Sequence, residues 1–211
     1  MWRSPRLHEI WTPSPQPRGE RQINRLSGLA RATALATLFL MSTSGFADPY
    51  KPKHGETDLK LEIEGRGEVF IKLFTQEAPK ASLQIIKLAK GGFYDKQRFH
   101  QVERTPKPYI IQIGDPDSKS GELREPGVYI NGSGTSVPYE NTGRQNVIGA
   151  VGLAHPMSDP NKGDSQFYIV LGTAKFLDGH YTVFGQVVSG MDVVQKVQLG
   201  DRLVSATIVT G

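Results

Sequence analysis

Residues 59–92 read LKLEIEGRGEVFIKLFTQEAPKASLQIIKLAKGG, and this stretch sets the structural pattern of the chain. Apolar and charged residues alternate over 59–64, which is typical of a strand with one buried face. The tract GRG at 65–67 turns the chain, and a second alternating run over 68–73 completes a predicted hairpin. The fold therefore begins with two antiparallel strands.

A helix is predicted directly after this hairpin. Pro79 suits a first helical turn, and residues 81–89 (ASLQIIKLA) form about three turns. Gly91 and Gly92 then provide a helix stop.

The remaining chain continues in short strands. A second short helix is indicated by Met191, Val194 and Val197 at helical spacing. Residues 115–145 are rich in Gly and polar residues and have no regular pattern. Eight strands and two helices favour a mainly β fold, a closed barrel capped by the two helices, although a sandwich fits the same pattern. The six further strand-like segments are 98–102, 109–114, 146–153, 166–171, 182–188 and 203–210.

The composition excludes several classes of function. The chain has 211 residues and no cysteine, which excludes thiol nucleophiles, disulfides and zinc-thiolate sites. Residues 1–47 hold six Arg and two Glu of the chain's 25 basic and 21 acidic residues, which leaves 19 of each in 48–211. Because this body is electrically balanced, we expect no nucleic-acid partner.

The N-terminal region has the features of a secretory leader. Several Arg precede an apolar run of about ten residues at 32–41 (ATALATLFLM), and small residues lead up to Ala47. The run is too short to span a membrane. We expect a signal peptide at 1–47, a polar linker at 48–56, a single domain at 57–211, and export, most simply to a bacterial periplasm.

Four ordered motifs carry a family resemblance. Phe99-His100 is followed by YIIQIGDP at 109–116, DSQFYI at 164–169 and FLDGHYTVFG at 176–185. Together they resemble the cyclophilin family of peptidyl-prolyl cis-trans isomerases over most of residues 57–210. The resemblance implies the eight-stranded cyclophilin barrel with two capping helices, which agrees with the element count above.

The resemblance also implies a function. Such an enzyme rotates X–Pro peptide bonds to assist protein folding, and it needs no cofactor and no metal. Its partners would be unfolded or folding polypeptides, and the family favours a monomer without a membrane span once the leader is removed. The alternative is a non-catalytic proline-peptide-binding or chaperone module on the same barrel. A weaker one is a purely structural barrel.

The matching positions define the candidate site. Gln112 would donate to the substrate backbone, and Gln166 would help to order the site. Ala154 and His155, the latter in place of a usual Asn, would flank the extended peptide. Tyr181 stands where many relatives have His. The residues that would form the proline pocket are Tyr109, Ile110, Tyr168 and Leu177, with Phe176 at the rim.

One departure affects catalysis. The family's catalytic Arg directly follows the Phe-His pair, and in this chain that position is Gln101. Arg104 lies in a nearby insertion and could bring its guanidinium to the site. A neutral Gln would be a weaker donor, because charge-assisted hydrogen bonds are roughly twice as strong. Arg104 and Gln101 are therefore both candidates for the missing group, with Arg104 the hypothesis to test.

Overall fold

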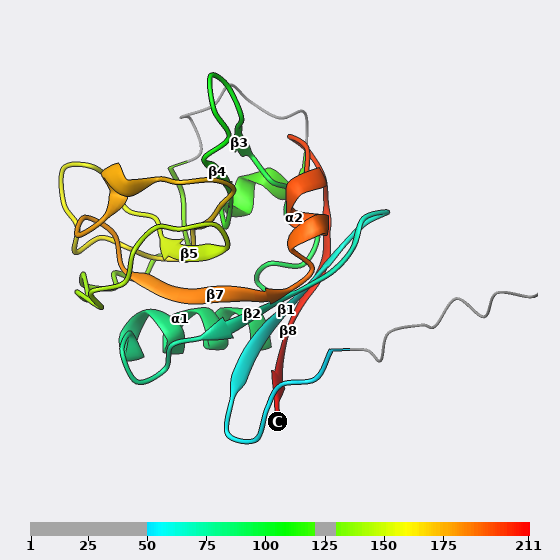
Figure 1. Ribbon diagram of the computed structural model, residues 1–211, viewed down its shortest axis with the longest axis horizontal. Coiled ribbons are helices and arrows are strands. Elements are labelled where there is room, and N and C mark those ends of the chain that lie inside the picture. The colour runs from blue at the N-terminus through cyan, green and yellow to red at the C-terminus, as the bar shows by residue number, and fades with distance from the viewer. Residues whose placement is uncertain (1–49, 121–129) are drawn as a thin grey trace, which may run out of the picture. The chain divides into compact units, whose positions relative to one another are not determined.

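The computed structural model describes residues 50–120 and 130–211 (Figure 1). Within them lie eight strands, two α-helices and two short 3-10 helices. The predicted leader at 1–47 lies outside the described residues. The strands are β1 (Thr57–Ile63), β2 (Gly67–Leu73), β3 (Gln101–Glu103), β4 (Ile110–Ile113), β5 (Ala150–Leu153), β6 (Phe167–Val170), β7 (Val183–Ser189) and β8 (Leu203–Thr210).

All eight strands form one antiparallel sheet in the order β3-β4-β6-β5-β7-β2-β1-β8. The sheet curls until its two end strands approach each other. A bridge between Arg98, ahead of β3, and Arg202, ahead of β8, connects the two ends. The mainly β fold and the eight-strand count are confirmed, and the curled sheet closes through this short bridge rather than through an eighth ladder.

Two helices cover the sheet where the sequence predicts them. Helix α1 (Pro79–Lys90) packs on β8 and β7, and α2 (Met191–Lys196) packs on β2 (Figure 1). Helix α1 buries Ala81, Ile85 and Ala89. Its first N–H groups have no helical partner, and the Glu140 carboxylate accepts from two of them at 3.0 and 2.9 Å.

The core lies inside the curl. Alternate residues of each strand point inward, so that Leu59 and Leu61 of β1 pack with Val69 and Ile71 of β2. These side chains are fully buried. Burial of apolar surface contributes about 25 cal/mol per Å² and is the main stabilising term for such a curled sheet.

Several strands are shorter than the sequence predicts. Strand β3 begins at Gln101 rather than at Arg98, because Phe99 already donates its N–H to Asp201 O on the other sheet end at 3.0 Å. Residues 146–149, predicted as strand, lie outside β5: 146 and 147 have no regular structure, and 148 and 149 form a turn. The two 3-10 helices, Pro116–Lys119 and Lys175–Leu177, were not predicted.

The segment predicted as a linker contacts the sheet. The Tyr50 hydroxyl donates to Asp58 at 2.8 Å, and its ring lies 4.9 Å from that of Phe70. Lys72 pairs with Glu56 at 2.7 Å. Residues 50–56 are thus held against β1 and β2.

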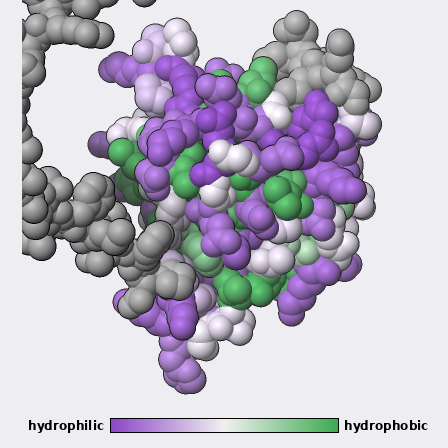
Figure 2. All heavy atoms as spheres, turned by 90° about the vertical axis from the view of Figure 1, so that its right-hand side faces the viewer, coloured by the Kyte–Doolittle hydropathy of each residue, from purple (hydrophilic) through white to green (hydrophobic). Residues whose placement is uncertain are grey.

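The surface beside α2 and the β1–β2 hairpin is mostly hydrophilic, with small separate apolar patches (Figure 2). Over residues 50–120 and 130–211, no helix is both long enough and apolar enough to cross a membrane.

Candidate functional site

The site occupies the outer face of β3, β4, β6 and β5. Gln101 pairs with Gln112, Gln112 with Tyr168, and Tyr168 with Gly152 across successive strands. Paired residues point to the same side of a sheet. The register therefore brings two of the predicted polar residues and one predicted pocket residue into one row.

An apolar cluster lies beside this row, separate from the inner core. We call it the outer cluster. Ile110 and Tyr168 are buried in it, and Tyr109 and Leu177, also predicted for the pocket, pack against it. Its buried members are Phe74, Ile110, Ala150, Tyr168, Val170, Ala174 and Val183, and Tyr109, Ala154, Leu177 and Tyr181 pack around them.

Tyr168 is fixed at the centre of the outer cluster. Its hydroxyl donates to Asn146 Oδ1 at 2.7 Å, and Asn146 donates its backbone and side-chain N–H groups to Asp178 Oδ1 at 2.6 and 3.0 Å. The backbone hydrogen bond and then the side-chain bond hold the pKa of the Asp178 carboxyl below its ordinary value. Gly152 leaves room for the phenol ring, since a Cβ there would collide with it. Asn146 was missed in the sequence because it belongs to none of the motifs.

Aromatic rings line the edge of the cluster. Tyr109 and Phe176 meet edge to face at 5.6 Å, and Phe176 is 64% exposed, which agrees with its predicted place at the rim. Tyr181 contacts Tyr168 edge to face at 5.6 Å and stacks on His155 at 4.3 Å. Aromatic pairs prefer edge-to-face or offset-stacked arrangements such as these. The rings form an exposed apolar wall beside Gln112.

A hydrogen-bonded series orients the Gln112 amide. Gln112 Nε2 donates to Gln166 Oε1 at 2.8 Å. Gln166 Nε2 in turn donates to Asn131 O at 2.8 Å and to Asp115 Oδ2 at 3.3 Å. Because Gln112 gives only one of its two amide hydrogens to Gln166, the second is available to a ligand. Asp115 lies within the 109–116 motif but was not predicted to have this role.

A cavity of about 470 Å³ adjoins Gln112 and Gln166. Ala154 and His155 form one wall, and residues 130–136 form another. Asp164 holds the second wall in place by accepting from Ser133 and from the backbone N–H groups of Gly134 and Thr135. This wall could not be predicted from the sequence, because the tract is irregular and its shape depends on a carboxylate about 30 residues away.

His100 lies beneath the polar row and is buried. Burial lowers the pKa of His100, against the opposing effects of the Asp115 charge and of hydrogen bonds with Gln166 and the Arg98 backbone. A neutral buried imidazole supports the structural role that its position suggests. Among the described residues, no group of three or more His, Asp or Glu side chains could hold a metal ion.

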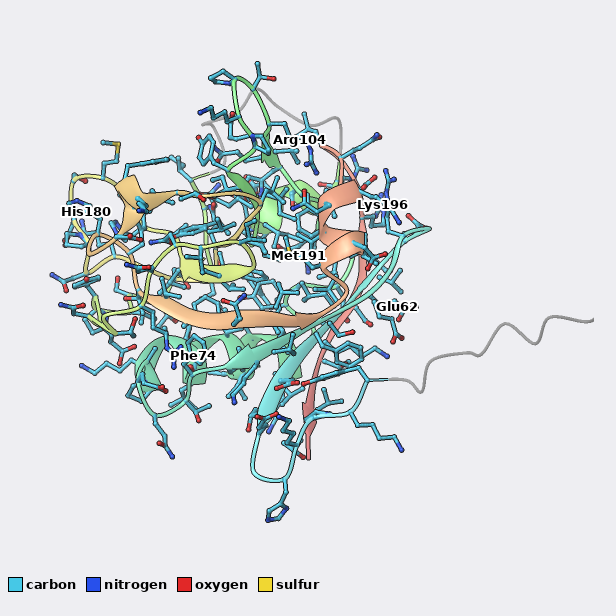
Figure 3. The ribbon with its side chains drawn as sticks, viewed as in Figure 1. Glu62, Phe74, Arg104, His180, Met191 and Lys196 are labelled. Carbon is cyan, nitrogen blue, oxygen red and sulfur yellow. The ribbon has the colours of Figure 1, made fainter. Side chains whose placement is uncertain are left out.

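The structure separates the two candidates for the missing Arg. Gln101 lies directly opposite Gln112 and donates to Glu103 Oε1 at 3.2 Å. The Arg104 guanidinium instead donates to Val197 O, at the end of α2, at 2.8 Å. Figure 3 shows Arg104 on the α2 side of the molecule, far from His180 beside the outer cluster. The structure brings Gln101 to the site and does not bring Arg104 there.

Comparison with known proteins places these features in a family. Residues 58–209 match the family described as cyclophilin type peptidyl-prolyl cis-trans isomerase/CLD. A probable peptidyl-prolyl cis-trans isomerase of Brucella suis is 32% identical over 197 residues, covering 86% of this chain and 95% of that protein. The peptidyl-prolyl cis-trans isomerase cypE of Dictyostelium discoideum is 38% identical over 133 residues, which cover 62% of this chain and 78% of cypE.

Solved structures share the fold. A cyclophilin type peptidyl-prolyl cis-trans isomerase from Cryptosporidium parvum, crystallised in the presence of the dipeptide Ala-Pro, matches with a TM-score of 0.57 and 23% identity. The match covers 73% of this chain and 98% of that chain. The cyclophilin AquaCyp293 from Hirschia baltica matches with a TM-score of 0.54 and 23% identity over 72% and 76% of the two chains.

Proposed function

This chain belongs to the cyclophilin-type peptidyl-prolyl cis-trans isomerases, and from that premise we propose that the outer cluster and the Gln112 row form its active site. The enzyme class and the fold follow from the family. The assignment of individual residues is the proposal. It is supported by the hydrogen bond that orients Gln112 on Gln166 and by the register that sets Gln112 opposite Tyr168.

The reaction is a rotation, with no bond made or broken. Amide resonance sets a barrier of about 18–20 kcal/mol for turning a peptide bond. X–Pro bonds therefore exchange unaided over tens of seconds or longer. A catalyst must bind the twisted amide more tightly than the planar one. Lowering the barrier by about 6 kcal/mol would accelerate exchange by about 10⁴ to 10⁵.

The outer cluster supplies the grip on the proline ring. Ile110 and Tyr168 form an apolar floor, while Leu177 and Phe176 flank it. A ring held against this floor stays fixed while the chain before it turns. Tyr168 is suited to the floor because Asn146 prevents its ring from swinging out.

Gln112 supplies the donor that favours the twisted state. Its amide is oriented by Gln166, so the second N–H can be directed to the carbonyl or nitrogen of the turning bond. Gln101, directly across the strand, adds a second neutral donor. The substrate chain would extend past Ala154 and the backbone of His155, pairing in extended form.

The orientation of Gln112 beside the outer cluster is the observation that carries this proposal, and NMR exchange tests it. The full chain is added to an Ala-Pro peptide, and cis–trans exchange peaks are compared with those for the Gln112→Ala variant. We expect fast exchange with the wild type and much slower exchange with the variant. Equal exchange with both proteins would place the chemistry elsewhere.

The non-catalytic binding module receives no support from the relatives, which are named as isomerases. It would be favoured only if the peptide bound without accelerated exchange. The clients would be folding polypeptides with X–Pro bonds, and we expect the enzyme to act as a monomer, which size-exclusion chromatography tests.

We also propose that the enzyme works outside the cytoplasm. The support is the Arg-rich start, the short apolar run and the small residues before Ala47. N-terminal sequencing of the protein recovered from a periplasmic extract tests this. A mature chain starting at Asp48 is the expected result, and recovery of the uncut chain from the cytoplasm would contradict it.

A further inference from the structure

His155 makes an unusual pair of contacts. Its Nδ1 lies 2.9 Å from Pro156 O, and its Nε2 lies 3.0 Å from His180 O. Both partners are backbone carbonyl oxygens, which can only accept hydrogen bonds. The same ring stacks on Tyr181 at 4.3 Å with an interplanar angle of 24°.

The protonation state of the ring decides whether both contacts can be hydrogen bonds. A neutral imidazole carries one N–H, so one of its nitrogens would direct a lone pair at a carbonyl oxygen. An imidazolium has two N–H donors and satisfies both carbonyls at once. The geometry around His155 therefore fits the protonated ring.

These contacts connect two loops beside the proposed proline pocket. His155 follows β5, whereas His180 and Tyr181 precede β7. The His155 ring bridges them, in addition to the backbone hydrogen bond from Leu153 N to Thr182 O at 2.9 Å. Because Tyr181 contacts Tyr168 edge to face at 5.6 Å, the position of this loop affects the floor of the outer cluster.

We propose that His155 is a positioning residue whose protonated ring fastens the loop before β7 to the loop after β5 and so holds Tyr181 against Tyr168. With both ring nitrogens protonated, both carbonyls have donors and the pocket wall is held. With one of these protons removed, one contact is lost and the wall loosens. This inference deepens the function proposed above and rests on it, because it concerns how tightly the same pocket grips a proline peptide.

Other ionisable groups lie on the segments that face the ring, and they shape the test. Carboxylates and lysines do not change charge in the range where histidine titrates. The His180 side chain does, although its contact with His155 comes from the backbone. His100 is common to every variant below, so its titration cancels in the comparison. The groups on the facing segments are Asp159, Lys162, Asp164, Tyr168, Asp178, His180 and Tyr181.

Two substitutions separate the ring's roles. His155→Phe keeps an aromatic ring to stack on Tyr181 but removes both N–H donors and the titration. His180→Gln removes the neighbouring titratable side chain while leaving the backbone carbonyl that His155 contacts.

The first measurement needs no substrate. Histidine ring N–H signals of the ¹⁵N-labelled full chain are recorded at about pH 5 and about pH 8.5, on either side of the ordinary imidazole range. We expect two solvent-protected ring N–H signals at the lower pH that are absent from His155→Phe and present in His180→Gln. If the His155 ring shows a single protonated nitrogen at the lower pH, or two unprotected ones, the proposal is overturned.

The second measurement follows the affinity for an Ala-Pro peptide across the same range. We expect wild type and His180→Gln to bind about threefold to fivefold more tightly at the lower pH, the size of one partly exposed hydrogen bond. His155→Phe should show no such step. A step of equal size in His155→Phe would sink the proposal.

The two measurements distinguish this inference from the proposed function. If no variant binds the peptide but the two protected ring N–H signals are present, the loop bridge exists and the proposed active site is wrong. If all variants bind the peptide with one common pH profile, the proposed pocket stands and the role of His155 is wrong.

Discussion

The inner and outer faces of the same four strands have different roles. Along β6, Phe167 and Ile169 point into the barrel core, while Tyr168 and Val170 point into the outer cluster. The inner side chains are apolar and fill the curl. The outer cluster also contains the Tyr168 hydroxyl, which donates to Asn146 Oδ1.

This difference shows how one sheet can carry both stability and function. Strand alternation sends successive residues to opposite faces, so a change at position 167 and one at position 168 should affect different properties. Inner substitutions should lower the free energy of unfolding with little effect on turnover per folded molecule. Outer substitutions should do the reverse.

Phe167→Ala is the strongest test of the inner face. Phe167 is fully buried and meets Tyr94 and Phe184 edge to face. Truncating such a residue costs about 3–5 kcal/mol. Denaturant unfolding should show this loss, while exchange catalysis per folded molecule stays within about twofold of wild type. If the variant is too unstable to purify, Phe167→Leu should show the same division with a smaller loss, and a large catalytic defect in either folded variant would break the comparison.

Gln112→Ala is the matching test of the outer face. Gln112 is half-buried and contacts Gln166 rather than the core. Removing one oriented donor typically costs about 10² in rate, so we expect exchange of an Ala-Pro peptide to slow by one to two orders of magnitude. The free energy of unfolding should change by less than about 1 kcal/mol. Gln76→Ala, at an exposed loop position, is the matched control and should leave both quantities unchanged. A stability loss as large as that of Phe167→Ala would erase the distinction.

Tyr168→Phe sharpens the comparison within the outer cluster. The change keeps the ring on Gly152 but leaves Asn146 Oδ1 without its donor. We expect a loss of about 1 kcal/mol in unfolding free energy and a few-fold weaker affinity for the peptide, measured by titration. Tyr139→Phe, which loses an exposed hydroxyl contact to Gly179 O, should have a smaller effect on stability. Equal effects of the two variants would show that the Asn146 contact is not important.

The sequence predicted more of the inner face of the sheet than of the outer face. Alternation in 59–73 predicted the first two strands, helical spacing predicted the two helices, and the four motifs supplied the candidate pocket residues, because these signals are local. The wall at 130–136 and the contact of Asn146 with Tyr168 could not be predicted. Both depend on polar partners about 20 to 30 residues away, in segments without periodicity.

The position of Arg104 was also beyond sequence reasoning. Its nearness along the chain to the site suggested a substitute for the missing Arg. In the structure its guanidinium donates to Val197 O at the end of α2. Chain proximity does not fix the direction of a long side chain, whereas pairing in the sheet fixes that of Gln101.

Asp178→Asn tests the hydrogen bonds between Asp178 and Asn146 that support the outer face, through the pH dependence of the free energy of unfolding. The pKa of Asp178 is lowered in the folded chain, chiefly by the backbone N–H of Asn146. A carboxyl with a lowered folded pKa stabilises the protein above its unfolded pKa, and this contribution disappears as pH falls through the folded value. At neutral pH the variant should be less stable by under about 1 kcal/mol, and the gap should close towards acid pH in denaturant unfolding. A gap that widens with acid would contradict the assigned partner.

Arg104→Ala is expected to have the smallest effect of these substitutions. It tests whether Arg104, which is held against the end of α2, takes any part in the outer face of the sheet. Because the guanidinium donates to Val197 O rather than to the site, removing it should leave peptide exchange within about twofold of wild type and cost about 0.5 kcal/mol of unfolding free energy. Gln101→Ala is the paired variant, since Gln101 lies beside Gln112 and should slow exchange by several-fold. If Arg104→Ala instead slows exchange more than Gln101→Ala, the guanidinium must leave Val197 during turnover and supply the charge that the Phe-His-Gln segment lacks. The outer face would then depend on a residue that the resting structure holds against α2.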